Sequence, residues 1–258
     1  MKTLTGPSGR SSTDTDTYKW YALALLFATY VINVIDRHII NILVEPIQRD
    51  LGLNDTEIGF ITGLAFALFY TVMGIPLAVL ADRWHRAKLI CLCSTVWSVM
   101  TMASGTATGF MSMSATRMGV GIGEAGLTPT ANSLIGDLFS PRSRGKALGI
   151  YISAVPVGTM LAGLIGGWLA ATWGWRVAFY AVGVAGLLLT LLFWFTFREP
   201  KRGILDDAVS IPEKETYSIR ETVVHLYSKR SCRYFFPAFA IIGFVGAAIN
   251  NWTPAFFM

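Results

Sequence analysis

The stretch WRVAFYAVGVAGLLLTLLFWFTF, residues 175–197, decides the fold, because Arg176 is its only charged residue. A transmembrane helix needs about 20 predominantly apolar residues. In lipid every backbone polar group must find a partner inside the protein, and a continuous helix provides these partners. An unbroken apolar run also differs from the strands of membrane barrels, which alternate over about ten residues. Residues 175–197 are therefore predicted to form a transmembrane helix.

Six further stretches have the same character. The 258-residue chain is 53% hydrophobic and 14% charged, whereas soluble domains carry about 25% charged residues. The charge is concentrated between the apolar stretches instead of being spread along the chain. We therefore predict an all-α membrane protein with seven spans, of which the other six are Trp20–Val44, Glu57–Ala81, Ala87–Thr108, Phe110–Leu138, Lys146–Ala171 and Arg233–Met258.

The basic residues predict how the chain is oriented. All 21 lysines and arginines except Arg37, Arg49, Arg117 and Arg176 lie in the N-terminal tail or beside the loops that follow spans two, four and six. Positive charge accumulates on the cytoplasmic side of a membrane. We therefore expect a multi-pass protein of the cell (inner) membrane with a cytoplasmic N-terminus, and we attribute the net charge of +5 to this asymmetry and not to nucleic-acid binding.

The polar segments set the expected domain boundaries. The N-terminal tail is rich in Ser, Thr and Asp and lacks the apolar core of a signal peptide. Ser218 and Glu221 form a capping-box pattern, which predicts a short amphipathic helix on the cytoplasmic surface; a solvated turn is the alternative. We expect a disordered cytoplasmic tail (1–19), a six-helix bundle (20–197), a cytoplasmic linker (198–232) and a seventh span (233–258).

Small residues and prolines modify the predicted spans. Small residues four apart let helices approach closely in lipid. We expect Pro129 and Pro156 to bend their helices, with neighbouring groups satisfying the freed backbone. The small-residue pairs are Gly59 with Gly63, Gly119 with Gly123, Ala162 with Gly166, and Gly163 with Gly167.

Four ionisable residues lie inside apolar spans: Asp36, Arg37, Arg117 and Glu124. Each costs about 2.5–3.5 kcal/mol at a helix centre, and such residues pair or face water. Counted from the outer ends of their spans, Asp36 lies about 9 Å deep and Arg117 about 10 Å deep. An ion pair between spans one and four is therefore feasible. Glu124 lies on the same helix face as Arg117 and deeper in the membrane, near the midplane.

Carboxylates near a cation can alternate between an ion pair and a protonated acid. Our hypothesis is that Asp36 and Glu124 bind protons with Arg117 as the switchable partner; a static structural pair is the alternative. Arg37 is expected to snorkel or to make a structural contact. Four further polar groups in spans are candidates to line a substrate cavity or to join helices: Tyr30, Asn33, Asn250 and Asn251.

Other classes of protein fit this sequence less well. The three histidines, His38, His85 and His225, have no partners at metal-ligand spacing. We predict no enzyme activity, catalytic residue, metal or cofactor. A receptor or rhodopsin would have the opposite orientation, and the seventh span contains no lysine for a retinal Schiff base.

Two loops and span four resemble the major facilitator superfamily. Asp82-Arg83-Trp84-His85-Arg86 follows span two and is similar to that family's cytoplasmic signature, with Ala78 and His85 at its glycine positions and Ala87 at its last basic position. Span four contains an Arg-x-x-x-Gly-x-Gly pattern from Arg117 to Gly123, and the next loop runs from Asp137 through Arg144 to Ala147. Glu124-Ala125 together with Asp36-Arg37 looks most like the spinster branch.

The resemblance implies two six-helix bundles with alternating access, and a proton-coupled carrier of lysophospholipids or sphingoid phosphates. It implies that Asp36, Arg117 and Glu124 couple protons and anchor the substrate. It further implies a conformational latch of Asp82, Arg83, Arg86, Asp137 and Arg144. An arginine fork suits an anionic head group.

The family has twelve spans, so we expect this chain to be the N-terminal half plus the first helix of the C-terminal half. Carriers of organic anions, sugars or drugs are alternatives, as is a truncated fragment that does not transport. The expected partners are the bilayer, protons and a small organic or lipid substrate, with a proton gradient as the energy source.

Overall fold

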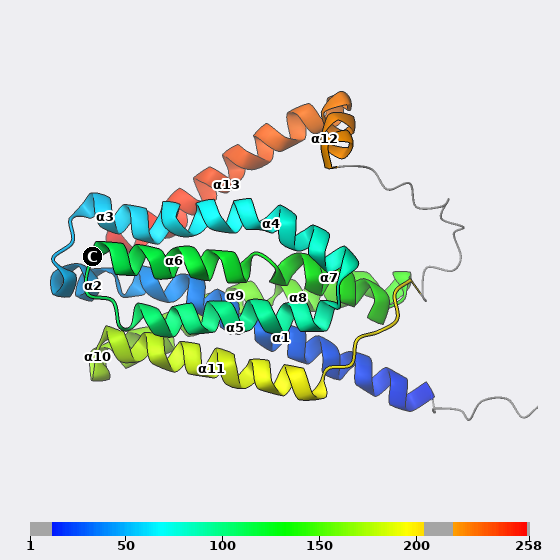
Figure 1. Cartoon of the computed structure of the whole chain (residues 1–258), viewed down its shortest axis with the longest axis horizontal. Coiled ribbons are helices and arrows are strands. Elements are labelled where there is room, and N and C mark those ends of the chain that lie inside the picture. Colours follow the sequence, from blue (N-terminus) through cyan, green and yellow to red (C-terminus); the bar gives the residue numbers. More distant parts are fainter. Residues whose placement is uncertain (1–11, 204–218, 257–258) are drawn as a thin grey trace, which may run out of the picture. The chain divides into compact units, whose positions relative to one another are not determined.

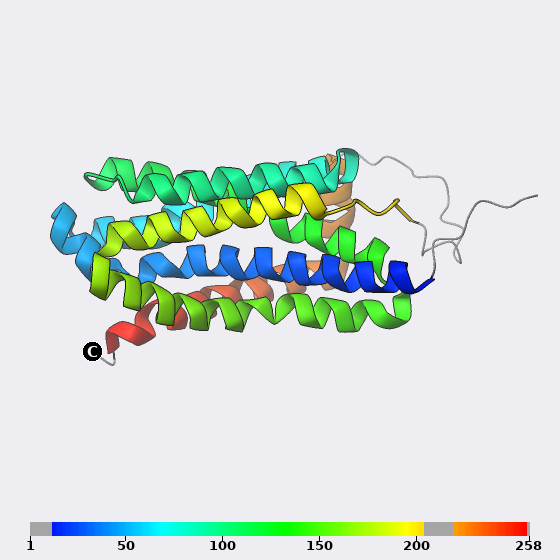
Figure 2. The same ribbon diagram turned by 90° about the horizontal axis from the view of Figure 1, so that it is seen from below.

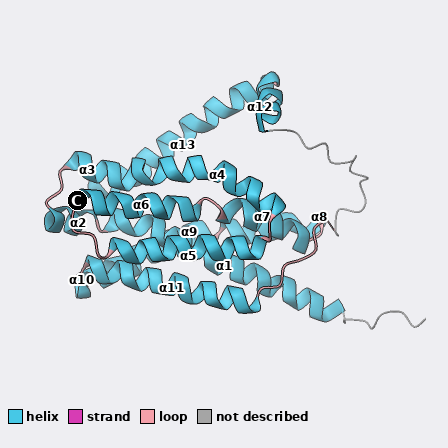
Figure 3. Cartoon of the chain, in the orientation of Figure 1, coloured by secondary structure: helices cyan, strands magenta, loops and turns pink. Residues whose placement is uncertain are grey.

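The computed structural model describes residues 12–203 and 219–256. In these ranges every regular element is a helix and no strand occurs (Figure 3). The chain divides into two compact units, Met1–Asp207 and Ala208–Met258. The prediction of an all-α protein is confirmed.

The first unit is a bundle whose long helices run side by side (Figures 1 and 2). Central α5 packs against α6 and α11, while α1 packs against α9 and α11. The elements are α1 (Ser12–Ile42), α2 (Val44–Leu51), α3 (Asp55–Gly59), η1 (Phe60–Leu64), α4 (Ala65–Arg83), α5 (Arg86–Ser104), α6 (Phe110–Glu124), α7 (Leu127–Leu138), α8 (Pro141–Ile152), α9 (Ala154–Leu161), η2 (Ala162–Gly166), α10 (Gly167–Trp173) and α11 (Trp175–Thr196).

The first helix begins earlier than predicted. Residues 12–19, expected to belong to a disordered tail, are the first residues of α1. Each residue added to an existing helix contributes a backbone hydrogen bond, so a helix formed in the apolar segment extends into its polar flank. Residues 1–11 of the predicted tail lie outside the described residues.

The connection between spans one and two is held by local backbone chemistry. Gly52 ends α2 with a φ of 62°, a left-handed conformation that favours glycine. Asn54 then caps α3: its side chain accepts from the Glu57 N–H, and the Glu57 carboxylate accepts from the Asn54 N–H, both at 2.9 Å. This capping box starts the second span at Asp55, two residues before the predicted Glu57.

The two prolines that were expected to bend their helices, Pro129 and Pro156, interrupt their spans. Pro129 has no N–H to donate to the carbonyl of Ala125, and α6 ends at Glu124 while α7 begins at Leu127. Pro156 likewise leaves the carbonyl of Ile152 without a donor, and α8 ends there. The prediction of one continuous helix over Phe110–Leu138 is therefore wrong, because the missing hydrogen bond is replaced by a turn. The Thr130 hydroxyl donates to the carbonyl of Gly126, which lies in this turn, at 2.6 Å.

Large apolar side chains point outward from the first unit. Leu68, Val72 and Ile75 of α4 and Leu188 and Phe195 of α11 are all more than half exposed. Five helical segments in the described residues are long and apolar enough to cross a membrane: Thr17–Ile42, Asp55–Arg83, Arg86–Ser104, Pro141–Trp173 and Trp175–Thr196. An apolar exterior on helices of this length is expected where lipid is the solvent.

Close helix approach depends on glycines of α6. A Cβ on Gly123 would lie 2.6 Å from the Trp97 backbone nitrogen, and one on Gly121 would lie 2.6 Å from the Phe66 carbonyl oxygen. Gly119 meets only the flexible Met100 side chain. The predicted packing role therefore holds for the pair Gly119 and Gly123, which seat α6 against α5.

Other predicted packing glycines have open surroundings. A Cβ placed on Gly59, Gly63, Gly163 or Gly167 would meet no neighbouring helix or side chain of the described residues within 4 Å, whereas one on Gly166 would lie 3.1 Å from the Ile39 side chain. The expectation of close packing is wrong for these four positions within the described residues, because spacing alone does not say which face of a helix meets a neighbour.

The second unit contains two helices in its described residues, α12 (Ile219–Ser228) and α13 (Arg230–Phe256). The helix predicted after the Ser218 cap is confirmed, although Ser218 itself lies outside the described residues. α13 covers most of the seventh predicted span.

The glycine contact in α6 predicts a stability difference. Gly123→Ala should lower the thermal unfolding midpoint in detergent, with a loss of about 1–3 kcal/mol from overpacking against α5 backbone. Gly59→Ala is the matched control and should change stability by less than about 0.5 kcal/mol. Equal midpoints for the two variants would show that the α5–α6 contact relaxes freely.

Candidate functional site

The first buried ion pair joins α1 to the end of α6. Nε and Nη2 of Arg37 donate to Oε2 of Glu124 at 3.0 and 2.7 Å. The Glu124 side chain is fully buried, while the Arg37 side chain is 33% exposed. The Arg37 guanidinium also lies over the rings of Phe66 at 5.0 Å and Tyr70 at 4.8 Å. One charge of this pair is therefore enclosed and the other reaches the surface of the unit.

The second ion pair is enclosed on both sides. Nη1 of Arg117 lies 3.6 Å from Oδ1 of Asp36, and the two side chains are 2% and 1% exposed. Arg117 donates to the Ser104 hydroxyl at 3.0 Å and lies over the Phe179 ring at 5.3 Å. The depth match that predicts a pair between spans one and four is thus realised, and α1, α5, α6 and α11 all contribute to it.

A threonine hydroxyl completes the surroundings of Asp36. The Thr101 hydroxyl is placed to donate either to Oδ2 of Asp36 or to the Trp97 carbonyl, which lies 2.9 Å away. A hydroxyl has one proton to donate and can also accept. The Asp36 carboxyl is therefore in contact with a hydroxyl as well as with the Arg117 guanidinium.

The structure shows which arginine each buried carboxylate contacts, while the expected roles of the two arginines stay predictions. Glu124 contacts Arg37 and not Arg117, although it shares a helix with Arg117. Arg117, expected to anchor substrate, is buried against Phe179, whereas Arg37, expected to snorkel or to make a structural contact, presents the accessible guanidinium. Helical spacing placed Glu124 and Arg117 on one face, but the chain turns directly after Glu124 and α1 supplies the nearer cation.

Of the other residues predicted to bind substrate, the structure describes the surroundings of Tyr30 and Asn33. Tyr30 is half-buried and stacks on Tyr151 with ring centroids 4.7 Å apart. Asn33 is 1% exposed, and its amide nitrogen has no hydrogen-bond partner among the described residues. Both lie on α1, as does Arg37. The side chains of Asn250 and Asn251 lie outside the described part of the chain.

A second polar cluster lies where α4 meets α5 and α7 ends. Arg86, only 1% exposed, contacts Asp137 at 2.5 Å and Glu199 at 3.1 Å, and donates to the Ser133 hydroxyl at 2.9 Å and the Pro200 carbonyl at 3.1 Å. Two of the predicted latch residues, Arg86 and Asp137, are therefore brought together. The segment after α11 closes the cluster.

Glu199 is the acidic centre of this cluster. Its carboxylate accepts from the Ala87 N–H at 3.1 Å and contacts both Arg86 and His85. Burial raises the pKa of Glu199, but the hydrogen bonds from Ala87 and Arg86 outweigh burial, and the pKa lies below its usual value. The carboxylate is therefore held in its charged form at neutral pH.

The remaining predicted latch residues have different surroundings. The side chains of Asp82 and Arg83 are exposed, and the carbonyl of Asp82 accepts from Arg202. Arg202 also donates to the carbonyls of Ala81 and Trp84, at 2.9 and 2.5 Å. Arg144 donates to the Gly136 carbonyl at 2.6 Å. Of the five predicted residues, Arg86 and Asp137 are in direct side-chain contact.

Sequence reasoning missed the roles of Thr101, Glu199 and Arg202. Glu199 is one of six acids in the loop after span six, so the sequence does not single it out. Arg202 sits in the same loop among several arginines with nothing to distinguish it. Thr101 resembles any other span threonine, and only the packing of α5 against α1 shows its contact with Asp36.

Comparison with known proteins places this geometry in a family. A profile described as the Major Facilitator Superfamily matches residues 26–258. An "MFS-type efflux pump" of Mycolicibacterium smegmatis is 34% identical, with 93% of this chain and 54% of the relative covered. A hexuronate transporter of Bacillus subtilis is 30% identical, with 91% and 55% covered. The chain therefore spans about half the length of these curated relatives.

A solved structure supports the same assignment. The crystal structure of a bacterial homolog to the human lysosomal transporter Spinster, in an inward-facing and unoccupied conformation, is 35% identical with a TM-score of 0.78. The match covers 97% of this chain and 56% of that one. The likeness to the spinster branch read from Asp36-Arg37 and Glu124-Ala125 is confirmed.

The Arg37–Glu124 pair predicts energetic coupling. Arg37→Gln leaves a buried carboxylate without its cation and should destabilise the protein by up to about 3 kcal/mol. Glu124→Gln in the same background should recover part of this loss, and a double-mutant cycle on detergent-solubilised protein measures the coupling. The exposed Arg49–Glu45 pair is the matched control, with expected coupling below about 0.5 kcal/mol. Additive losses at Arg37 and Glu124 would contradict the coupling.

The lowered pKa of Glu199 predicts a pH dependence. A carboxyl with a depressed pKa stabilises the fold above its unfolded pKa, and this contribution disappears as pH falls through the folded value. Between about pH 6 and about pH 3.5, the thermal midpoint should therefore fall further in the unmodified protein than in Glu199→Gln. Glu45→Gln controls for the loss of one charge. Parallel pH profiles for the protein and Glu199→Gln would refute the role of Glu199.

Proposed function

Because the chain belongs to the major facilitator superfamily, we propose that it acts in secondary active transport of an anionic or amphipathic organic solute by alternating access. A proton gradient is the proposed energy source. The observation that carries the proposal is the pair of ion pairs Arg37–Glu124 and Arg117–Asp36, buried between helices that are long and apolar enough to span a bilayer.

Asp36 and Glu124 are the proposed proton sites. Ionisable groups inside a membrane protein are costly and mark proton or substrate paths. Oε1 of Glu124 is buried without a hydrogen-bond partner among the described residues, so this carboxyl has an oxygen free to carry a proton, whereas Oδ1 of Asp36 faces Arg117. Protonation would weaken the pairs with Arg117 and Arg37, and a rearrangement that separates the charges would favour protonation.

Arg37 is the proposed anchor for the substrate anion. Its guanidinium is the more exposed of the two and still has donors beyond those used by Glu124. The rings of Phe66 and Tyr70 beneath it offer apolar surface next to the charge. This combination favours an anion with an apolar part, such as a lysophospholipid or a sphingoid phosphate.

A sugar acid is the second candidate substrate. The relative named hexuronate transporter supports it, and Tyr30 and Asn33 could supply hydrogen bonds to hydroxyl groups. Asn33 has an amide nitrogen without a partner. Carriage of drugs or neutral sugars has no comparable support from the site.

The proposed location is the cell (inner) membrane with the N-terminus in the cytoplasm. The support is the lysine and arginine bias of the sequence. The Arg86 cluster would then lie at the cytoplasmic end, where we propose that it couples the α4–α5 loop to α7 and the segment after α11 as the bundle moves. In this role Arg86, Asp137 and Glu199 act together, with Asp82, Arg83 and Arg144 beside them.

Transport in proteoliposomes tests the proton sites. Asp36→Asn and Glu124→Gln should each abolish uptake driven by a pH gradient while counterflow of labelled lysophospholipid persists, because exchange needs no net proton movement. Glu45→Gln removes an exposed carboxylate and should leave both activities intact. Gradient-driven uptake at the unmodified rate in either buried variant would remove that residue from the coupling mechanism.

Substrate class is tested in the same vesicles. Labelled lysophospholipid should exchange in preference to labelled hexuronate, since the aromatic rings at Arg37 favour an amphipathic anion. The reverse preference would favour the sugar-acid alternative. Exchange of neither compound, with the protein folded and inserted, would contradict the proposed substrate class.

A further inference from the structure

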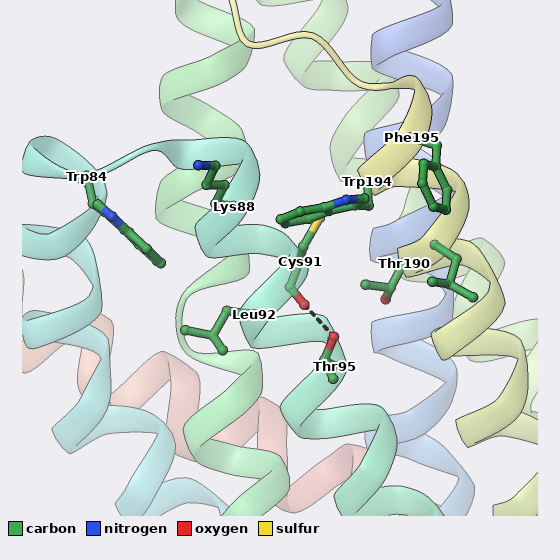
Figure 4. A pocket seen from close by; sticks show the side chains of 9 residues that line it. Trp84, Lys88, Cys91, Leu92, Thr95, Thr190, Trp194 and Phe195 are labelled. Carbon is green, nitrogen blue, oxygen red and sulfur yellow. Dashed lines mark hydrogen bonds between the residues drawn. The ribbon is translucent and has the colours of Figure 1, made fainter.

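A groove outside the ion-pair site runs between α5 and α11 (Figure 4). Its volume is about 520 Å³, within the range of about 300–1,000 Å³ that is typical of ligand pockets. It extends from the end of α4 along the first half of α5. The lining residues that matter to the argument are Trp84, Lys88, Leu92, Leu191 and Trp194.

The walls of this groove are apolar and open. Leu92, Leu191 and Trp194 are 50%, 54% and 55% exposed. The polar groups that line the groove use their hydrogen bonds internally: the Thr95 hydroxyl donates to the Cys91 carbonyl and the Thr190 hydroxyl to the Gly186 carbonyl, both at 2.8 Å. The walls therefore suit a hydrocarbon chain and offer little to a polar solute.

One positive charge lies at the mouth. Lys88 stands near the start of α5 and is exposed. Two acids of the neighbouring polar cluster already have cationic partners, Asp137 with Arg86 and Glu199 with Arg86 and His85. No ion pair of Lys88 occurs within the described ranges. The groove thus has a cationic end and an apolar length, and the complement of this pattern is an anionic head with a hydrocarbon tail.

The dimensions agree with a lipid seated in one leaflet. Lys88 and Thr95 are separated by two turns of α5, which is about 10 Å along the helix axis. Trp84 and Trp194 flank the groove, and tryptophans are enriched at the level of the head groups. A lipid with its head group at Lys88 would place the upper part of an acyl chain along Leu92 and Leu191.

We propose that this groove is a binding site for one anionic phospholipid of the surrounding leaflet. The lipid phosphate contacts the Lys88 ammonium, and an acyl chain occupies the channel between α5 and α11. Basic pockets between transmembrane helices bind anionic head groups in this way. The inference rests on the helices spanning a membrane, and it is independent of the residues proposed for proton coupling and substrate binding.

Native mass spectrometry of the detergent-purified chain tests the site, with phosphatidylglycerol and phosphatidylcholine of equal chain length as probes. The protein should bind one phosphatidylglycerol about fivefold or more tightly than phosphatidylcholine, as expected for one lysine at a membrane surface. Lys88→Gln should remove this preference. Leu92→Trp, which fills the groove, should weaken binding of both lipids.

Lys201→Gln is the matched control, because Lys201 is an exposed lysine that does not line the groove. It should keep the preference for phosphatidylglycerol, and unchanged thermal midpoints should show that the variants fold. Equal binding of the two lipids by the unmodified protein would overturn the proposal. A preference for phosphatidylglycerol that survives Lys88→Gln would also overturn the proposal. Unaltered binding of both lipids by Leu92→Trp would overturn it too, because it would show that protein and not lipid covers the groove.

Discussion

The cost of a charge in a low-dielectric interior governs the arrangement of the first unit. An isolated carboxylate such as that of Glu124 cannot stay ionised when buried unless a cation lies against it. Arg37 supplies that cation from α1 at 2.7 Å, and Asp36 and Arg117 satisfy the same requirement between the same two helices. The rotation and depth of α1 against α6 are therefore tied to charge pairing as well as to apolar packing. Either helix could slide or turn only by separating charges or by moving a proton.

The Arg37–Glu124 pair lies at a break in the helix, directly after α6 ends. Pro129 denies the Ala125 carbonyl a backbone donor, so the chain turns at Ala125 and Gly126 before α7 resumes. Gly121 and Gly123 meanwhile hold α6 against backbone atoms of neighbouring helices. The result is a closely packed segment that ends at the Glu124 carboxylate, directly before the turn at Ala125 and Gly126.

Charged residues within the spans and those at the end of the unit near Arg86 have different numbers of partners. Within the spans each buried charge has one main partner, whereas Arg86 and Glu199 form a network that joins the loop after α4, the end of α7 and the segment after α11. Hydrogen bonds from Ala87 and Arg86 outweigh burial and hold the pKa of Glu199 below its usual value, so the interactions at this end respond to pH. Lys88 stands apart from that network at the mouth of an apolar groove, which leaves its charge available to a lipid head group.

The sequence by itself determined the class of fold, the positions of the spans and the four charges within them. Long apolar runs allow only helices in lipid, and the rarity of charges in these runs makes each one conspicuous. It also predicted the contact of Asp36 with Arg117, since depth in a membrane is counted along a helix axis. Only the tertiary structure decided that Glu124 pairs with Arg37, that Thr101 contacts Asp36 and that Glu199 joins Arg86. These contacts link residues 65 to 113 positions apart. Their formation depends on how each helix is rotated, which is set by packing against its neighbours.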